Sequence, residues 1–295
     1  MRVISDLHVH SRFAMACSSA ITLKGMEQTA KEKGINLIGT GDFTHPEWLK
    51  EIKANLEEAE GGGAFKIKGA PSSVRFILSS EVCTVSLDSK KITRRIHHCL
   101  LMSNLDSVES LNEILSKYGS LPSDGRPILS MRAAELVEAV MGVDSNAFVF
   151  PAHAWTPYFG VFGAISGFDS MKEAYEDQEK HIYALDTGLS SDPSMNWRIS
   201  ALDKYALLST SDMHSLPKIG RKMSLFEMDV ISYAGIISAI KQKDNKRFTG
   251  TVDFFPEEGK YHFSAISFVL TAVRMSYSVP RSLIMSSYSL TTGAE

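Results

Sequence analysis

The chain opens with three potential metal ligands at alternate positions. Asp6, His8 and His10 lie in the run Asp6-Leu7-His8-Val9-His10. If this run is a strand, alternate side chains point to the same side, so both imidazoles and the carboxylate share one face. Imidazole nitrogens suit zinc and similar divalent ions. Further candidate ligands lie within or just after later apolar runs: Asp42, Glu81, His97, His98, His153, Asp212 and His214.

Glu81 and the later histidines add candidate ligands from distant parts of the chain. A glutamate at the end of the apolar strand expected at residues 74–79 is costly to bury unless it is paired or bound to a metal, and Glu81 could bridge two ions. His97 and His98 are adjacent on a predicted strand, so only one of them faces the interior. We expect His98 to be the ligand and His97 to lie at the surface or behind the site. For His153, a hydrogen-bonded core histidine is the alternative.

Asp212 and His214 form a D-x-H pair that mirrors the opening H-x-H pair. On the first and last strands of a closed barrel, the two pairs would be neighbours and could share one centre. Asp42 is a further candidate ligand, although capping of the next helix is an alternative role. His45, just before Pro46, is either a ligand or part of the helix start. Because ligating imidazoles must be neutral, activity is expected to fall below about pH 6.

Strand-like and helix-like segments alternate along the chain, which indicates an α/β fold. The expected strands are residues 1–7, 36–39, 74–79, 92–102, 147–152, 182–185 and 206–209, and the expected helices 23–33, 46–60, 107–117, 133–141, 171–181, 196–202 and 233–242. Successive βα units predict a mostly parallel sheet. Six or seven such units in about 250 residues favour a closed barrel, whose chemistry lies at the C-terminal ends of the strands.

Composition and charge narrow the class of protein. The chain has 295 residues, 44% of them hydrophobic and 22% charged, with a net charge of -3. That charge gives no overall signature of a nucleic-acid-binding protein, although a local basic groove is compatible with it. The three cysteines lack C-x-x-C spacing, and we find neither a signal-peptide pattern nor an apolar run of membrane-spanning length. We therefore expect a soluble, cytoplasmic protein with no membrane partner.

Two parts are expected along the chain. Residues 1–263 carry the alternating pattern and form the expected catalytic barrel. Residues 264–295 contain eight serines and only three charged residues, without a sustained helical or strand period. We interpret this segment as an irregular or non-native tail, with a short helix docked on the barrel as the alternative.

The order and types of the candidate ligands resemble the motifs of the PHP (polymerase and histidinol phosphatase) superfamily of metal-dependent phosphoesterases. The resemblance implies a distorted (β/α)7 barrel of PHP type. It also implies two or three divalent metal ions, zinc foremost, with manganese, iron or magnesium as alternatives. Many members read T-D-H at the second motif, where the histidine is missing here or displaced to His45. The residues that match the motifs are Asp6, His8, His10, Ser11, Asp42, Glu81, His98, His153, Asp212 and His214.

Longer motifs are similar to endonuclease Q, a family of archaeal and bacterial DNA repair enzymes. The matching segments are residues 11–13, 39–42, 45–49, 95–98, 151–157 and 186–193. The resemblance runs over about residues 1–263 and implies a nuclease that nicks DNA 5′ of deaminated bases (uracil, hypoxanthine, xanthine) or at abasic sites. Asp186 stands where the family usually has glutamate. The serine-rich tail stands where the family has a cysteine zinc-binding module that contributes to DNA binding.

The expected reaction is hydrolysis of a phosphodiester, with a metal-bound water held by Glu81 and Asp212. An extruded base would stack on aromatic side chains, and cations would hold phosphates; core packing and solvated charge are the alternative roles. The candidates around the substrate or behind the ligands are Arg12, His45, Trp48, Trp155, Asp186 and Lys218. Basic runs, among them residues 90–95, could follow a DNA backbone.

Two other functions fit the same residues. The first is a PHP-type small-molecule phosphomonoesterase. The second is a metal-binding but inactive, truncated module that works through a protein partner.

Overall fold

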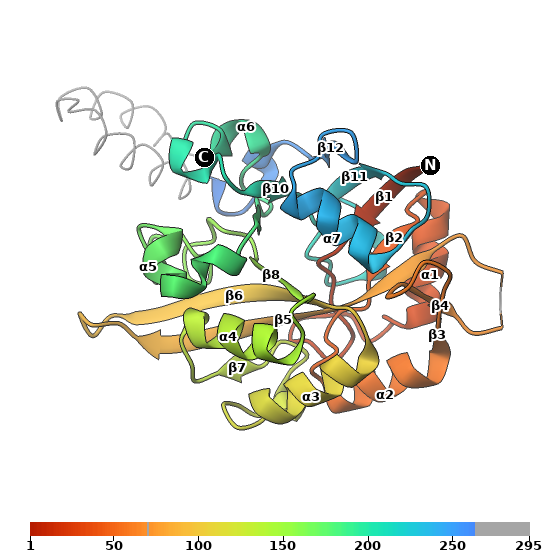
Figure 1. Cartoon of the computed structure of the whole chain (residues 1–295), viewed down its shortest axis with the longest axis horizontal. Helices are drawn as coiled ribbons and strands as arrows, with labels where there is room; N and C mark the ends of the chain where they lie inside the picture. The colour runs from red at the N-terminus through yellow and green to blue at the C-terminus, as the bar shows by residue number, and fades with distance from the viewer. Residues whose placement is uncertain (70, 263–295) are drawn as a thin grey trace, which may run out of the picture.

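A mixed sheet with helices packed along its outer side forms the centre of the structure (Figure 1). The computed structural model describes residues 1–69 and 71–262, so the expected tail at 264–295 lies outside the described residues. The strands are β1 (Arg2–Asp6), β2 (Leu37–Gly39), β3 (Leu56–Glu58), β4 (Phe65–Ile67), β5 (Arg75–Leu87), β6 (Thr93–Met102), β7 (Ile128–Leu129), β8 (Phe148–Pro151), β9 (Ala184–Asp186), β10 (Ala206–Leu208), β11 (Met223–Glu227) and β12 (Phe248–Val252). The helices are α1 (Leu23–Glu32), α2 (Pro46–Asn55), α3 (Leu105–Leu115), α4 (Ala133–Val143), α5 (Met171–Tyr175), α6 (Pro193–Asn196) and α7 (Tyr233–Lys241).

The strand order confirms the α/β class but not a mostly parallel sheet. One sheet runs β12-β11-β1-β2-β5 and continues from β5 through β6 to β8. Among the strands of residues 1–69 and 71–262, six ladders are antiparallel and four are parallel. The expectation of a mostly parallel sheet was therefore wrong. The short turn after Leu87 returns the chain directly as β6, and a direct hairpin connection makes its two strands antiparallel.

No closed ladder links all the strands within the described part of the chain. β9 and β10 pair only with each other. An isolated bridge between Val149 and Ile182 crosses from β8 towards β9. On the other side, the Ser209 amide donates to the Ser224 hydroxyl at 3.1 Å, which links the end of β10 to β11. The pairing thus differs from the closed barrel expected from the sequence at these two seams.

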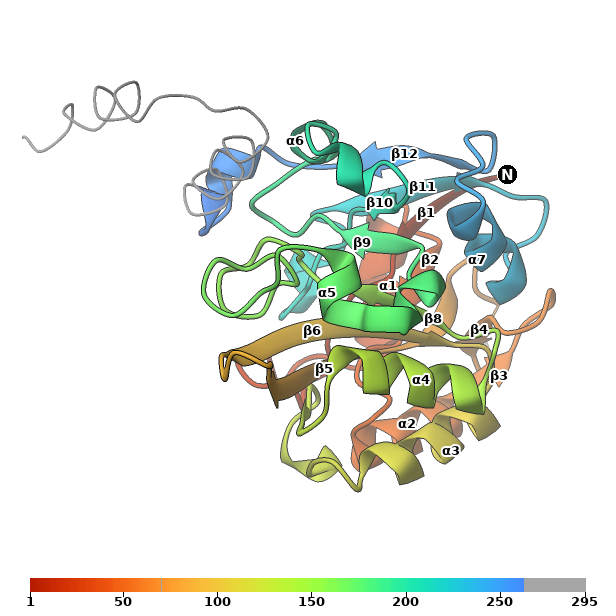
Figure 2. The ribbon, with the colours of Figure 1, turned by 60° about the vertical axis from the view of Figure 1, so that its left-hand side comes forward.

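Side chains from eight strands nevertheless meet in one inner core. This inner core includes Val3, Leu37, Ile77, Leu101, Phe150, Ala184, Leu208 and Phe226. A second cluster fills the space between the outer face of the sheet and helices α1 to α5. Figures 1 and 2 show α2, α3 and α4 gathered along one side of the β5–β6 hairpin. Polar side chains that point inward from the strands are consequently enclosed rather than solvated.

Several element boundaries differ from those expected. β5 spans 13 residues and includes Glu81 near its middle, so this glutamate does not end a strand. α2 ends at Asn55 and β3 begins at the next residue. The expected helix at 171–181 is divided into α5 and a 3-10 segment at Glu176–His181. No helix within residues 1–69 and 71–262 has the length and apolarity needed to cross a membrane.

Trp48 ties α2 to the sheet. Its side chain is completely buried, and its indole N–H donates to the carbonyl oxygens of Thr40 (3.1 Å) and Gly41 (2.9 Å). We expect Trp48→Phe to lower the free energy of unfolding by about 1–3 kcal/mol, since it removes a buried hydrogen-bond donor and leaves a small void. Urea denaturation measures the effect. Trp197→Phe is the matched control, because the Trp197 side chain is exposed; equal effects of the two changes would contradict this role of Trp48.

Candidate metal centre

The opening H-x-H and the late D-x-H motifs lie side by side. Val9 forms a parallel bridge with Met213. The Asp212 amide donates to the His8 carbonyl at 3.0 Å, and the His10 amide to the Met213 carbonyl at 3.3 Å. This pairing brings His10 Nε2 to 3.1 Å from Asp212 Oδ1. The potential ligands of two segments about 200 residues apart in the sequence are therefore in direct contact.

Glu81 lies between two groups of potential ligands. Its Oε1 is 3.1 Å from both His97 Nδ1 and His153 Nε2, and 3.5 Å from His8 Nε2. Its Oε2 is 3.3 Å from His10 Nε2. The carboxylate thus belongs both to a group with His8, His10 and Asp212 and to a group with His97 and His153; within each group the donor atoms lie within 4.8 Å of one another. Such sharing suits a carboxylate that contacts two cations.

The structure reverses the expected roles of His97 and His98. The β5–β6 register places His97 on the same side of the hairpin as Glu81. His98 points to the opposite side, where its ring nitrogens lie 2.9 Å from Thr84 Oγ1 and 3.1 Å from the Tyr175 hydroxyl. Burial lowers the pKa of His98 to about 3, so its ring is neutral. His98 is a satisfied core residue, and His97 takes the place expected for it.

Two further carboxylates hold the histidines from behind. Asp42 Oδ1 is 3.0 Å from His10 Nδ1, which leaves His10 Nε2 directed at the cluster. Asp186 accepts the backbone N–H of His153 at 3.0 Å and lies 3.9 Å from His8 Nδ1. Carboxylates in this position fix the tautomer and orientation of ligating imidazoles. The structure therefore places Asp42 behind a candidate ligand rather than among the clustered donor atoms.

Three residues of the site have a strained backbone. Asp42, His153 and Asp212 have φ angles of 45°, 30° and 47°. This left-handed region is unfavourable for residues other than glycine, and such conformations concentrate at functional sites. Each of the three follows closely after a strand, so a sharp change of chain direction brings its polar groups into the centre.

The charges of the site are strongly coupled. Burial alone would lower the pKa of His10, but the charge of Asp42 and hydrogen bonds to Asp212 and Glu81 raise that pKa well above its usual value. Burial alone would raise the pKa of Glu81, but His97, His8 and Arg126 hold it well below its usual value. Protons on His8 and His10, whose pKa values are both raised, thus balance the buried carboxylates. A divalent cation can replace those protons.

The donor atoms fit a divalent metal. Both ring nitrogens of His8 and Oε1 of Glu81 are buried and make no hydrogen bond within the described residues. Such buried polar atoms are costly to leave unsatisfied. Coordination to a cation would satisfy His8 Nε2 and Glu81 Oε1, which lie 3.5 Å apart, while His8 Nδ1 faces Asp186. The mixture of imidazole nitrogens and carboxylate oxygens is compatible with zinc, manganese or iron. His8, His10, Glu81, His97, His153 and Asp212 are the residues that could hold the ions.

Other expected site residues lie beside the cluster or away from it. The His214 ring centroid is 4.8 Å from that of His10, so this residue borders the cluster. The other expected residues make contacts elsewhere. Arg12 forms an ion pair with Glu51, and the ring of His45 stacks on that of Phe13 with a centroid distance of 4.2 Å. Trp48 is buried in the hydrophobic core, Trp155 Nε1 donates a hydrogen bond to Asn196 at 2.8 Å, and Lys218 is exposed.

Sequence reasoning missed Arg126. Its Nη1 lies 3.2 Å from Glu81 Oε2, and its backbone N–H donates to Asp124 at 2.9 Å. It stands in a loop after Gly125, where no periodic pattern or known motif marks it. Arg221 was expected only as part of a basic run, residues 218–222, that could follow a DNA backbone. It donates instead to the carbonyl oxygens of Ser211 (2.6 Å) and Asp212 (3.0 Å) and so holds the late D-x-H motif in place.

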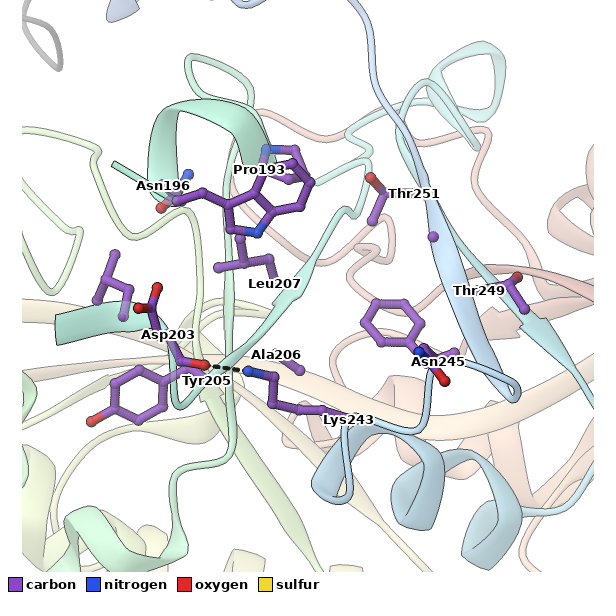
Figure 3. A pocket seen from close by; sticks show the side chains of 14 residues that line it. Pro193, Asn196, Asp203, Tyr205, Ala206, Leu207, Lys243, Asn245, Thr249 and Thr251 are labelled. Carbon is purple, nitrogen blue, oxygen red and sulfur yellow. Dashed lines mark hydrogen bonds between the residues drawn. The ribbon is translucent and has the colours of Figure 1, made fainter. Parts of the chain in front are cut away.

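A separate cavity does not include the clustered ligands. A cavity of about 650 Å³ lies between α6, β10 and β12, lined by Trp197, Tyr205 and Lys243 among others (Figure 3). None of the clustered ligands lines this cavity. The site is therefore recognised by its chemistry and not by volume.

The chain is similar in fold and sequence to lesion-specific DNA endonucleases. It superimposes on endonuclease Q of Pyrococcus furiosus with a TM-score of 0.76 and 33% identity, covering 88% of this chain and 61% of that one. A second structure, endonuclease Q with a 27-mer duplex carrying an abasic lesion at the active site, gives a TM-score of 0.78 and 34% identity, covering 89% of this chain and 62% of that one. No family model matches.

The chain also matches part of a curated relative in sequence. The uncharacterised protein MJ0043 of Methanocaldococcus jannaschii is 35% identical over 153 residues, which are 52% of this chain and 16% of that protein. The chain thus spans about three fifths of the two endonuclease Q chains and a smaller part of this relative.

The two adjacent histidines allow a direct test of the centre. We expect His97→Asn to lower the affinity for divalent metal at least about 10-fold, because it replaces the imidazole Nδ1 beside Glu81 by an amide group, a weaker ligand than imidazole for zinc-type ions. His98→Asn is the matched control. It should lower the free energy of unfolding by about 1–3 kcal/mol while metal content, measured by plasma mass spectrometry, stays at the wild-type level. Loss of metal only in the His98 variant would contradict the register.

Metal affinity should depend on pH. Protons compete with the cation for His10, whose pKa is raised in the metal-free protein. Protonation therefore weakens binding as the pH falls, and the apparent affinity for zinc should rise between about pH 6 and pH 8. Equilibrium dialysis at several pH values measures this. An affinity that does not change with pH would show that no raised imidazole pKa is linked to binding.

Proposed function

We propose that this chain is a metal-dependent phosphodiesterase that nicks DNA at damaged positions, as endonuclease Q does. The observation that supports this most is the centre around Glu81, in which two ligand groups share one carboxylate. The similarity to a structure of endonuclease Q with an abasic-lesion duplex supports DNA as the substrate class. Deaminated bases (uracil, hypoxanthine, xanthine) and abasic sites are the proposed lesions.

The residues of the chain would act mainly by holding charge in place. His8, His10, Glu81, His97, His153 and Asp212 would bind two or three divalent ions, with zinc proposed first. When bound, such ions polarise phosphoryl oxygens and lower the pKa of water. Asp42 and Asp186 keep the imidazole rings oriented, and the rigid β5–β6 hairpin keeps Glu81 between the two ligand groups. Little reorganisation is then needed when charge develops on the phosphate.

The proposal also includes the arrangement of the barrel and the location of the protein in the cell. An isolated β-bridge crosses one seam of the sheet, and hydrogen bonds between the Ser209 backbone and the Ser224 hydroxyl cross the other. Strands on both sides contribute to the inner core. These contacts support a distorted (β/α)7 arrangement of PHP type over residues 1–263. A cytoplasmic location would fit an enzyme that acts on the cell's own DNA.

A nicking assay tests the function. Duplexes that carry one uracil, hypoxanthine or abasic site are incubated with the metal-loaded protein, with an undamaged duplex and an aryl phosphomonoester alongside. We expect strand cleavage at the lesion only, complete loss with a chelator, and at least about a 100-fold loss in Glu81→Gln, which removes the shared charge. Glu113→Gln, the same change at an exposed position of α3, is the matched control. Cleavage of the aryl phosphate alone would identify a small-molecule phosphatase, and metal binding without turnover an inactive module.

A further inference from the structure

We propose that Arg126 and Arg95 form a phosphate-binding strip that leads from the metal centre outward along the β5–β6 hairpin and holds the DNA backbone. This inference rests on the proposed function and adds to it the residues that bind the substrate.

Arg126 stands at the entrance to the centre. Its side chain is 20% exposed, while the Glu81 carboxylate beside it is completely buried. One guanidinium nitrogen contacts Glu81, and Nε and Nη2 donate no hydrogen bond to any residue that the structure describes. A planar guanidinium with free N–H groups matches the geometry of a phosphate. A phosphate bound beside the Glu81 carboxylate would lie within reach of this guanidinium, which is 3.2 Å from that carboxylate.

Arg95 continues the same face away from the centre. It precedes His97 by two positions on β6, so both side chains point to the same side of the hairpin. Arg95 is exposed, and its guanidinium has no ion pair within the described part of the chain. The charges of Arg126 and Arg95 both act on Cys83, the residue paired with His97. Burial still dominates and raises the pKa of this thiol to about 12. The two arginines therefore border a common stretch of the hairpin.

The neighbouring Arg94 shows the contrast. It points to the other side of the strand, where it pairs with Asp88 at 2.7 Å and lies over the Phe168 ring at 4.5 Å. The charge of Arg94 is therefore neutralised by Asp88 within the protein. Beyond Arg95 the hairpin projects past α4, and exposed Lys90 and Lys91 occupy its turn (Figure 1). Available positive charge thus follows one face of the hairpin.

Two cations in a row favour a polymer over a small ligand. A phosphomonoester at the centre could contact Arg126, but it would have no second phosphate for Arg95. A nucleic-acid strand presents successive phosphates, and phosphate contacts fix the position of a strand without reading its sequence. Arg95 is therefore the residue that distinguishes a DNA backbone from a small phosphate ester.

Salt dependence of binding tests the strip. Fluorescence anisotropy measures binding of the metal-loaded protein to an undamaged duplex, which is not expected to be cut, at several salt concentrations. Each phosphate contact contributes about 0.9 to the slope of log K against log salt concentration. We expect Arg95→Ala and Arg126→Ala each to reduce the slope by about 1, and Arg126→Lys to retain it. Arg2→Ala is the charge-matched control, because Arg2 is at the start of β1, at the end of that strand away from the H-x-H motif. It should leave the slope unchanged.

The outcomes separate this inference from the proposed function. Metal content is measured for every variant; if Arg126→Ala loses metal, Arg95→Ala and Arg126→Lys carry the test. Nicking by the wild-type protein together with slopes equal to that of Arg2→Ala would overturn the strip and leave the function standing. Salt-dependent binding that falls with the arginines, without nicking of any lesion, would support the strip as a polyanion site and overturn the nuclease. A wild-type protein that neither binds nor nicks DNA would overturn both.

Discussion

The burial of the Glu81 carboxylate is the constraint on which the structure of the site depends. An isolated charge in a protein interior is highly unfavourable, and it persists only where opposite charge or a metal compensates it. Here the compensation comes from imidazoles of β6, of the loop after β8 and of the segment after β1. Arg126 adds a permanent positive charge. The centre can form only when these segments meet.

The fold meets that requirement through a rigid interior. Eight strands contribute apolar side chains to the inner core, and this packing fixes the positions of the strands relative to one another. The hairpin register then decides which residues of β5 and β6 point inward. The left-handed backbone at Asp42, His153 and Asp212 turns the chain so that short side chains reach the same point. Local strain is tolerated because the surrounding packing determines these conformations.

Sequence reasoning predicted the elements of this centre better than their orientation. The alternation at His8 and His10 and the apolar strand before Glu81 are local patterns, which can be read directly from the sequence. They predicted that these three side chains are buried candidate metal ligands. The distinction between His97 and His98 depends on the register of a hairpin, which no local pattern specifies. Once Glu81 and His97 are known to share an antiparallel hairpin, their side of the sheet follows from the pairing.

Other features depended on tertiary contacts that a single sequence does not reveal. Arg126 lies in a loop without a motif, and its role appears only when that loop packs beside Glu81. Asp42 was expected as a ligand because of its type, yet its contact with His10 Nδ1 places it behind that ring. The closed barrel followed from counting βα units, but β9 and β10 form their own small sheet.

Anomalous X-ray diffraction from crystals of the metal-loaded protein would locate the ions relative to Glu81. We expect separate anomalous peaks on the two sides of the Glu81 carboxylate, one beside His8, His10 and Asp212 and the other beside His97 and His153. Ions located elsewhere, or none within coordination distance of Glu81, would contradict this expectation.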